Sequence, residues 1–315
     1  NIFERYLTVW VGLCIVAGVL VGQAFPSLVS TFRSWELGEG SHINLPIAVL
    51  IWLMIIPMMM KVDLTALRNV GRRPQGLFVT LIVNWLVKPF SMAFFAWMFF
   101  RFVFGAWMTP AEADQYIAGC IILAAAPCTA MVFVWSYLTD GDAAYTLVQV
   151  TVNDLLMLLL FAPIIGFLVS GTSSLTVPFS ILVYSVVAFI VIPLATGTLA
   201  RAWLITRHGK TWFEQDFLPR FGPMTIVALL LTLVFIFAFQ ADNIVAKPWH
   251  VALIAIPILF QVYMNASLAY GLMRWLRVPY VVAAPGALIG ASNFFELAVA
   301  TAIALFGPES GAALA

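Results

Sequence analysis

Residues 124–131 read AAAPCTAM, and they place a proline among small residues in the middle of an apolar segment. Proline has no amide hydrogen, and its ring displaces the carbonyl four residues earlier, so a helix breaks here. A second apolar segment carries GASNFFE at residues 290–296, shortly after Pro285 and Gly286. Broken backbone at membrane depth is tolerated only where it is buried in protein or lines a cavity. The two stretches therefore predict two interrupted membrane helices that form a polar site.

The composition excludes a soluble domain. The chain has 315 residues, of which 63% are hydrophobic and 9% are charged, whereas soluble domains carry about 25% charged residues. A net charge of +1 gives no basic surface for nucleic acid. Cys14, Cys120 and Cys128 have neither disulfide-framework nor zinc-site spacing. We therefore expect an all-α polytopic protein in a lipid bilayer, with no cofactor and no nucleic-acid partner.

Crossing the bilayer takes about 20 apolar residues, and nine segments qualify: 6–25, 43–60, 77–100, 116–138, 143–169, 177–200, 223–240, 249–273 and 280–306. Residues 307–315 resemble the start of a tenth helix, so we expect the given sequence to lack most of that helix. Eleven of the 15 Lys and Arg residues fall on the amino-terminal side of these segments and three on the other. Cytoplasmic loops carry this excess, which predicts a cytoplasmic amino terminus.

The segments also suggest an internal repeat, with residues 1–169 as the first half and 170–315 as the second. The interrupted segments are the fourth of each half, and a charged loop follows the second and the sixth segments. Five segments are an odd number, so the second half must be inverted relative to the first. Inverted repeats with interrupted helices at corresponding positions are typical of secondary transporters.

Three ionisable side chains lie inside the apolar segments: Lys88, Asp154 and Glu296. Each costs about 2.5–3.5 kcal/mol to insert at the membrane centre, so each needs a partner or a wet cavity. One alternative is a Lys88–Asp154 ion pair that only holds two helices together. One helical turn spans 3.6 residues, so we expect Ser292 and Asn293 to share a helical face with Glu296. This arrangement predicts a cation or proton site, and the alternative is a carboxylate merely hydrogen-bonded within the bundle.

Cys128 lies at the first interruption, beside Thr129. Cysteine usually behaves as a small buried hydrophobic residue, which is our interpretation of Cys14 and Cys120 and the alternative for Cys128. A thiol prefers soft, thiophilic species to hard ions, and capture by one thiol is weak enough for a carrier that must release its cargo. The remaining sulfur-bearing and aromatic candidates are interpreted as residues of the membrane-interface belt or of helix packing. They are Trp52, Trp85, Trp97, Trp135, Met54 and Met58–Met60.

Four motifs together resemble a known family: NWLVKPF at 84–90, AAPCTAMVFVWS at 125–136, YTLVQVTVND at 145–154 and GASNFFELAVA at 290–300. They look like the arsenite efflux permeases of the arsenical-resistance type, in the superfamily of the bile acid:sodium symporters. The resemblance implies ten helices in two inverted repeats of five, with helices 4 and 9 broken. Helices 1, 2, 6 and 7 would form a panel domain, and helices 3–5 and 8–10 a core domain. It also implies export of trivalent arsenite, with antimonite left open, across the cell membrane in exchange for protons.

Carried over residue by residue, the family's essential cysteine falls on Cys128 and its essential glutamate on Glu296. Arsenite would reach the site as neutral As(OH)₃, its arsenic would bind Cys128, and an incoming proton would neutralise Glu296. We expect its hydroxyls to bond to Thr129, Asn84, Ser292 and Asn293. A supporting charge network is expected from Lys88, Asp154 and Asn153, with Lys88 standing where sodium-coupled relatives hold a cation.

Two other functions stay open at this point. One is a sodium-coupled symporter of a small organic anion, and the other is a passive channel for small neutral solutes. An enzyme is not expected, because His42, His208 and His250 fall in loops or at segment ends and make no metal-ligand pair. The sequence leaves a monomer and a homo-oligomer equally open.

Overall fold

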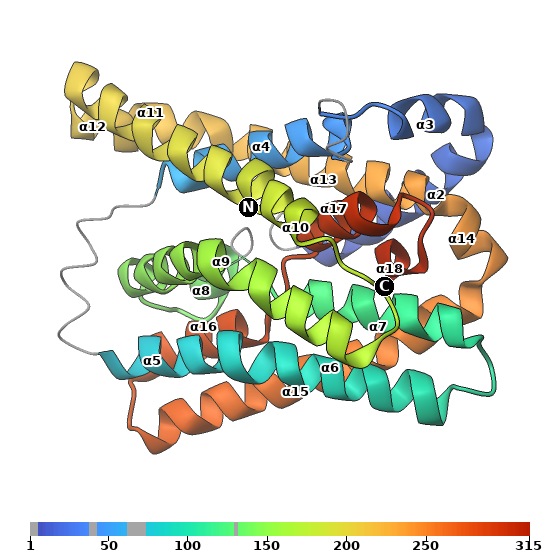
Figure 1. Ribbon diagram of the computed structural model, residues 1–315. Helices are drawn as coiled ribbons and strands as arrows, with labels where there is room; N and C mark the ends of the chain where they lie inside the picture. The colour runs from blue at the N-terminus through green and yellow to red at the C-terminus, as the bar shows by residue number, and fades with distance from the viewer. Residues whose placement is uncertain (1–5, 38–42, 62–73, 129–131) are drawn as a thin grey trace.

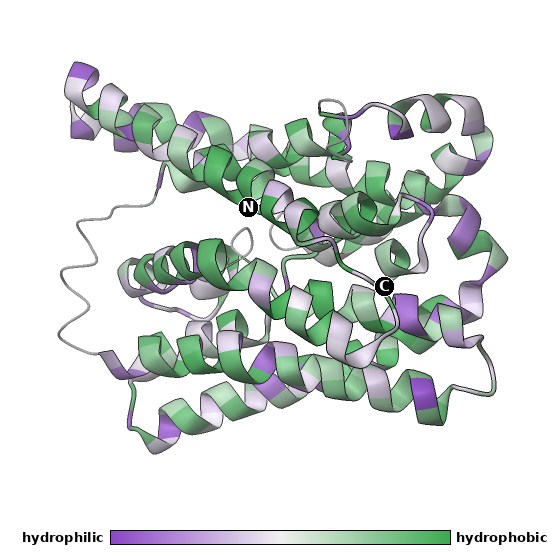
Figure 2. Cartoon of the chain, in the orientation of Figure 1, coloured by the Kyte–Doolittle hydropathy of each residue, from purple (hydrophilic) through white to green (hydrophobic). Residues whose placement is uncertain are grey.

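The computed structural model describes residues 6–37, 43–61, 74–128 and 132–315, and these residues are almost entirely helical (Figure 1). Within those ranges the β-structure amounts to one isolated bridge between Glu36 and Asn44. Figure 2 shows apolar residues along the lengths of the helices and polar residues gathered towards their ends. Lipid offers no hydrogen-bond partners to the backbone, whereas a helix satisfies its own backbone hydrogen bonds. This architecture therefore follows from the apolar composition.

The elements follow one another along the chain without a long loop among the described residues. The first half contains α2 (Leu7–Ala24), α3 (Pro26–Arg33), α4 (Leu45–Met59), α5 (Pro74–Ile82), the π-helical turn η2 (Val83–Val87), α6 (Lys88–Met98), η3 (Phe99–Val103), α7 (Pro110–Ala124), α8 (Val132–Leu138) and α9 (Ala143–Thr172). The second half contains α10 (Phe179–Val186), η4 (Val187–Val191), α11 (Ile192–His208), α12 (Lys210–Trp212), η5 (Phe213–Phe217), η6 (Leu218–Arg220), α13 (Phe221–Phe239), α14 (Ala241–Ala246), α15 (Pro248–Trp275), α16 (Tyr280–Ala291), α17 (Phe295–Phe306) and α18 (Gly311–Leu314).

The chain is a multi-pass membrane protein by the length and composition of its helices. Among the described residues, six helical segments are long and apolar enough to cross a membrane, and a seventh is added if α2 and α3, bent by 102°, count as one. α4 is apolar but only 15 residues long. Each of the nine apolar segments expected from the sequence contains helix. The fourth is divided between α7 and α8, and the ninth between α16 and α17.

The helices pack as two groups. Group I consists of α2, α4, α11 and α13, which contact one another, and group II consists of α5–α9 and α15–α18 (Figure 1). α10 connects the groups, because it contacts α9 and α17 as well as η4. The chain therefore enters group I twice and group II twice. Both interrupted helices belong to group II, and α17 also touches α4 of group I.

A π-helical turn in group II has a clear cause in the sequence. The backbone N–H of Lys88 donates to the carbonyl of Val83, five residues earlier. Pro89 follows, and it lacks an amide hydrogen and crowds the preceding turn, so the helix widens locally. Such bulges often occur at functional sites, and this one carries Asn84 and Lys88. η4 lies before Pro193 in the same way.

The sixth expected segment was predicted to end at residue 200, but the helix continues to His208. The extra residues include arginine and leucine, which are good helix formers even outside the bilayer. The helix ends only at Gly209, whose φ of +86° favours glycine. The positively charged loop predicted here is therefore mostly helical.

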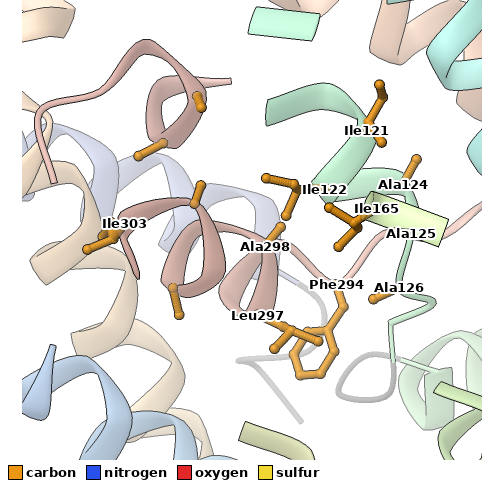
Figure 3. Packing of buried hydrophobic residues seen from close by; sticks show 14 of the residues in the cluster. Ile121, Ile122, Ala124, Ala125, Ala126, Ile165, Phe294, Leu297, Ala298 and Ile303 are labelled. Atoms are coloured by element: carbon orange, nitrogen blue, oxygen red, sulfur yellow. The ribbon is translucent and has the colours of Figure 1, made fainter. Parts of the chain in front are cut away.

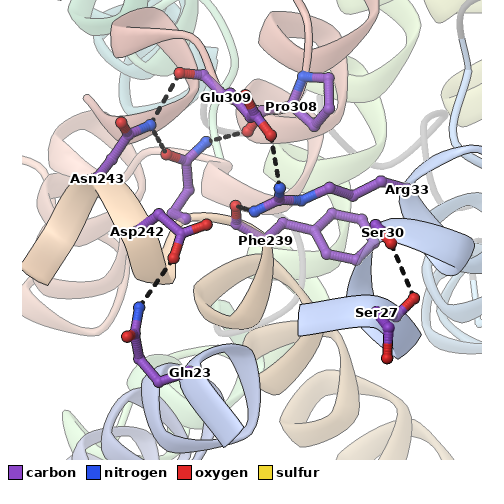
Figure 4. Close-up of polar contacts among 10 residues, drawn as sticks. Gln23, Ser27, Ser30, Arg33, Phe239, Asp242, Asn243, Pro308 and Glu309 are labelled. Carbon is purple, nitrogen blue, oxygen red and sulfur yellow. Dashed lines mark hydrogen bonds and ion pairs between the residues drawn. The ribbon is translucent and has the colours of Figure 1, made fainter. Parts of the chain in front are cut away.

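A polar network at one end of the bundle ties the loop between α17 and α18 to α3, α14 and the carboxyl end of α13 (Figure 4). Arg33 Nη1 lies 2.7 Å from Glu309 Oε1, and Arg33 also donates to the carbonyl of Phe239. Gln240 Nε2 donates to the carbonyl of Pro308 at 2.6 Å, and Asn243 Nδ2 donates to that of Glu309 at 2.8 Å. We call this set the Arg33 network.

Two glycines allow α2 to approach α13 closely. A Cβ built on Gly18 would lie 2.7 Å from the carbonyl oxygen of Val234, and one on Gly22 would lie 2.6 Å from that of Ala238. Glycines four residues apart are a common device for close helix contact in membranes. A Cβ built on Gly12 of the same helix, by contrast, would meet no neighbouring helix within 4 Å in the described part of the chain.

We therefore expect Gly22→Leu to destabilise the protein by about 1–3 kcal/mol, as overpacking usually does. Gly12→Leu is the matched control and should leave the thermal midpoint unchanged or slightly raised. The measurement is thermal unfolding of both purified variants in the same detergent. Equal midpoints would show that the α2–α13 contact adjusts without cost.

Candidate functional site

The two interruptions meet in backbone contact. The amide of Phe294 donates to the carbonyl of Ala126 at 3.0 Å. The amide of Cys128 donates to Ser292 Oγ at 3.3 Å. The ends of α7 and α16 and the start of α17 therefore converge on one point, and Cys128 lies there. The sequence predicted two broken helices, and the structure brings their breaks together.

The second break lies later than expected. α16 continues through Gly290 to Ala291, and Ser292, Asn293 and Phe294 are not helical. Gly290 instead permits close packing, since a Cβ there would lie 3.2 Å from Val83 Cγ1. The prediction that Ser292 and Asn293 share a helical face with Glu296 is therefore wrong. Ser292 Oγ caps α16 by donating to the carbonyl of Ile289 at 2.9 Å.

Lys88 is fully buried and reaches both breaks. Its Nζ donates to the carbonyl of Ser292 at 2.6 Å and to that of Ala126 at 3.4 Å. These carbonyls follow the last turns of α16 and α7, where a helix carries partial negative charge. The lysine Nζ therefore lies against the carboxyl ends of two half-helices, a place where a cation is favourable.

The two buried carboxylates contrast with the lysine. Both oxygens of Asp154 and one oxygen of Glu296, Oε2, are buried and have no hydrogen-bond partner among the described residues. The described residues contain no Lys88–Asp154 ion pair, so the lysine binds backbone carbonyls in place of the carboxylate considered from the sequence. Glu296 lies in the first turn of α17, where the helix dipole favours negative charge. An unpartnered buried carboxylate is costly, which makes both groups candidates for a ligand or a proton.

A hydrogen-bonded cluster holds the side chain of Asn84, a further predicted site residue. Asn84 Nδ2 and Trp85 Nε1 each donate to Asn153 Oδ1 at 3.0 Å. Asn153 Nδ2 donates to the carbonyl of Gln149 at 2.7 Å. Asn84 and Asn153 were predicted separately, and the structure brings them together. Trp85 was interpreted as packing, but it is buried and belongs to this cluster; its position next to Asn84 was the only signal in the sequence.

The predicted site residues thus divide into those at the crossing and those beside it. Cys128, Ser292 and Lys88 share contacts there, Asn293 follows Ser292 directly, and Glu296 lies four residues later in the first turn of α17. Asn84 lies on η2, which packs against α16. Thr129 lies outside the described residues.

Apolar side chains enclose this point on one side. Figure 3 shows Ile122 of the first interrupted segment beside Ala298 of α17, and Ala126 beside Phe294 of the second break. Phe294, Leu297 and Ala124–Ala126 are buried in one cluster with Cys128. Small residues at residues 124–126 let the two backbones approach, as at helix contacts in membranes generally. The two breaks therefore pack closely at the crossing, with polar groups on one side and buried apolar side chains on the other.

Comparison with known proteins gives consistent matches. The model of the Sodium Bile acid symporter family matches residues 48–247. An arsenical-resistance protein, Acr3, of Alkaliphilus metalliredigens is 50% identical over 313 residues, covering 99% of this chain and 87% of that protein. An uncharacterised transporter of Synechocystis is 44% identical over 324 residues, covering 100% of this chain and 84% of its own length. The Acr3 of Corynebacterium glutamicum is 31% identical over 323 residues, covering 100% and 84% respectively.

Proposed function

The chain belongs to the sodium bile acid symporter family, and from that starting point we propose that it exports trivalent arsenite in exchange for protons. The observation that carries the proposal is a thiol, that of Cys128, at the meeting point of two interrupted helices. Two relatives named for arsenical resistance support the choice of substrate. Antimonite has the same charge, valence and affinity for thiols, and it is included as a second substrate.

The proposal places the protein in the cell membrane with a cytoplasmic amino terminus, on the distribution of Lys and Arg. The Arg33 network then lies at the outer end. Group I, with α10, corresponds to the panel domain and group II to the core domain. Residues 1–169 and 170–315 form the two inverted repeats. Transport consists of movement of group II against group I, which exposes the crossing to each side in turn.

Capture of arsenite is a reversible ligand exchange. The sulfur of Cys128 forms a bond to arsenic, one As–O bond breaks, and the thiol proton leaves with that hydroxyl as water. The remaining hydroxyls bond to the polar groups around the crossing, where Asn84, Ser292 and Asn293 are placed. Hydrolysis of the S–As bond reverses each of these steps and releases As(OH)₃. A single thiol binds arsenic weakly enough for this reversal to occur in every cycle.

Coupling resides in Glu296, which lies two residues beyond the backbone contact of Phe294 with Ala126. A proton from the outside neutralises this carboxylate, and the neutral site returns through the membrane at lower cost than a charged one. Lys88 supplies a fixed positive charge at the ends of α7 and α16, so no sodium ion is needed there. Asp154 and Asn153 complete the network on α9.

The test is arsenite transport in everted membrane vesicles with and without a pH gradient. An acidic interior should drive accumulation of arsenite without any sodium. Loss of accumulation when the gradient is collapsed distinguishes the carrier from a passive channel. A strict sodium requirement would favour the symporter of an organic anion and would contradict the proposal.

Lys88→Met should reduce arsenite export at least tenfold, because it removes the cation that faces two helix carboxyl ends. The side-chain volume is nearly unchanged, so the effect comes from the charge. Export is measured in the same vesicles, with the amount of inserted protein determined by immunoblot. Full export by this variant, at equal protein level, would show that Lys88 has no part in transport.

A further inference from the structure

The orientation of the Asn84 side chain is set by its neighbours. Asn153 donates through Nδ2 to the carbonyl of Gln149, which can only accept. Its Oδ1 therefore points the other way, towards Asn84 and Trp85. The indole N–H of Trp85 can only donate, which is consistent with an oxygen at that place. Asn84 must consequently turn its amide nitrogen to Asn153, and its Oδ1 points elsewhere.

That oxygen is a buried acceptor with no partner among the described residues. Asn84 is fully buried, so the oxygen is not satisfied by bulk water. Asn293 Oδ1 is buried and unpartnered in the same way. Buried polar atoms in native proteins are nearly always hydrogen-bonded. Asn84 lies on η2, which packs against α16, and Asn293 lies in the break that follows α16, so these two oxygens indicate a ligand that donates hydrogen bonds.

Several donors around the crossing, by contrast, already have protein acceptors. The amides of Cys128 and Phe294 bind Ser292 Oγ and the carbonyl of Ala126. Lys88 Nζ binds two carbonyls. Among the described residues, the unpartnered buried atoms named above are acceptors: Asn84 Oδ1, Asn293 Oδ1, Glu296 Oε2 and both carboxylate oxygens of Asp154. Acceptors suit hydroxyl groups and disfavour oxyanions, since oxyanions would bring further acceptors.

We infer that Asn153, assisted by Trp85, positions Asn84 so that Asn84 Oδ1 and Asn293 Oδ1 each accept a hydrogen bond from one arsenic hydroxyl. The inference rests on the proposed function and refines it. After Cys128 replaces one hydroxyl of As(OH)₃, two hydroxyls remain, one for each oxygen. The site thereby selects trivalent species by their number of hydroxyls, and Asn153 is a positioning residue without contact to the substrate.

The test compares arsenite with methylarsonous acid, CH₃As(OH)₂, which keeps one hydroxyl after exchange with the thiol. Binding to purified protein is measured by titration calorimetry. Asn84→Leu should weaken arsenite binding about tenfold, equivalent to about 1.4 kcal/mol. It should change the affinity for methylarsonous acid less than about twofold, because the single hydroxyl can still use Asn293. Arsenate at large excess should compete with neither ligand.

Asn153 is tested by two substitutions. Asn153→Leu frees the Asn84 amide to rotate and should lower the preference for arsenite over methylarsonous acid several-fold. Asn153→Asp should retain the preference, because the protonated carboxyl keeps an acceptor towards Asn84 and a donor towards Gln149. Thr232→Val, at a buried hydroxyl bonded only to the carbonyl of Ala228 on its own helix, is the control and should change neither affinity.

Equal losses for both ligands in Asn84→Leu would reduce Asn84 to a structural role and overturn the inference. The inference would also be overturned if Asn153→Asp lost as much of the preference for arsenite over methylarsonous acid as Asn153→Leu does. If the wild-type protein binds no arsenite, the proposed function itself is wrong, and this outcome is distinct from the other two.

Discussion

Cys128→Ser is expected to reduce arsenite transport by at least about 100-fold, which corresponds to about 2.8 kcal/mol. The hydroxyl of serine has nearly the size of the thiol but is a hard ligand with little affinity for arsenic. The backbone amide of residue 128 still reaches Ser292 Oγ, so the crossing is retained. The measurement is the initial rate of arsenite uptake into everted vesicles under an acidic interior.

Cys120→Ser is the matched control for this prediction. Cys120 is buried on α7, before the break. It should keep the wild-type rate, and both variants should keep the wild-type thermal midpoint. Rapid uptake by Cys128→Ser, at an equal level of folded protein, would rule out a required thiol.

Glu296→Gln is expected to abolish the response of arsenite flux to a pH gradient. Glutamine has the shape of protonated glutamate and cannot release a proton, so the site stays in its neutral form. Arsenite should still equilibrate across the membrane, but the accumulation ratio should fall to about 1. Under the proposed exchange, one proton per arsenite would give the wild type a ratio of about ten for each pH unit, because a pH unit is worth about 1.4 kcal/mol.

Glu112, an acidic residue outside the bilayer, is excluded as the source of a pH response in the transport assay. Lys247 donates a hydrogen bond to Glu112, and this contact lowers the pKa of Glu112 to about 2. The stabilising effect of a lowered carboxyl pKa is present above the unfolded value and is lost only as the pH falls towards 2. Glu112 therefore stays ionised across the range of a transport assay.

Glu214→Gln, at an exposed surface, is the control for Glu296→Gln. An unaltered pH response of Glu296→Gln would disprove the role of Glu296 in coupling.

The membrane class and the places of the helices could be predicted because composition and hydropathy leave few alternatives. Cys128 and Glu296 could be singled out because a thiol at a proline break and a lone carboxylate in an apolar segment are conspicuous. The position of the second break could not, since it depends on contacts of Ser292 and Phe294 with residues more than 160 positions away. A glycine marked that break in the sequence, whereas in the structure it serves close packing.

The partner of Lys88 was also beyond reach of the sequence. Charge alone favours Asp154 as its partner, but the lysine binds carbonyls that are exposed only because two helices end beside it. Asn153 was named only through its neighbour Asp154, and its contact with Asn84 requires α9 to pack against η2. The identity of a residue does not show which backbone carbonyls are exposed or how a side-chain amide is oriented. The partners of Lys88 and Asn153 could therefore be found only from the structure.

The Arg33 network joins the far end of α17 to α3, α14 and the carboxyl end of α13. α17 has 12 residues, so it is a rod about 18 Å long with Glu296 at one end and the network loop at the other. Two hydrogen bonds at about 1 kcal/mol each and an exposed ion pair of at most about 1 kcal/mol hold that loop to Gln240, Asn243 and Arg33. One proton supplies about 1.4 kcal/mol per pH unit and about 2.3 kcal/mol per 100 mV. Under the proposed exchange of arsenite for protons, breaking the Arg33 network therefore lies within the free energy that a single proton supplies.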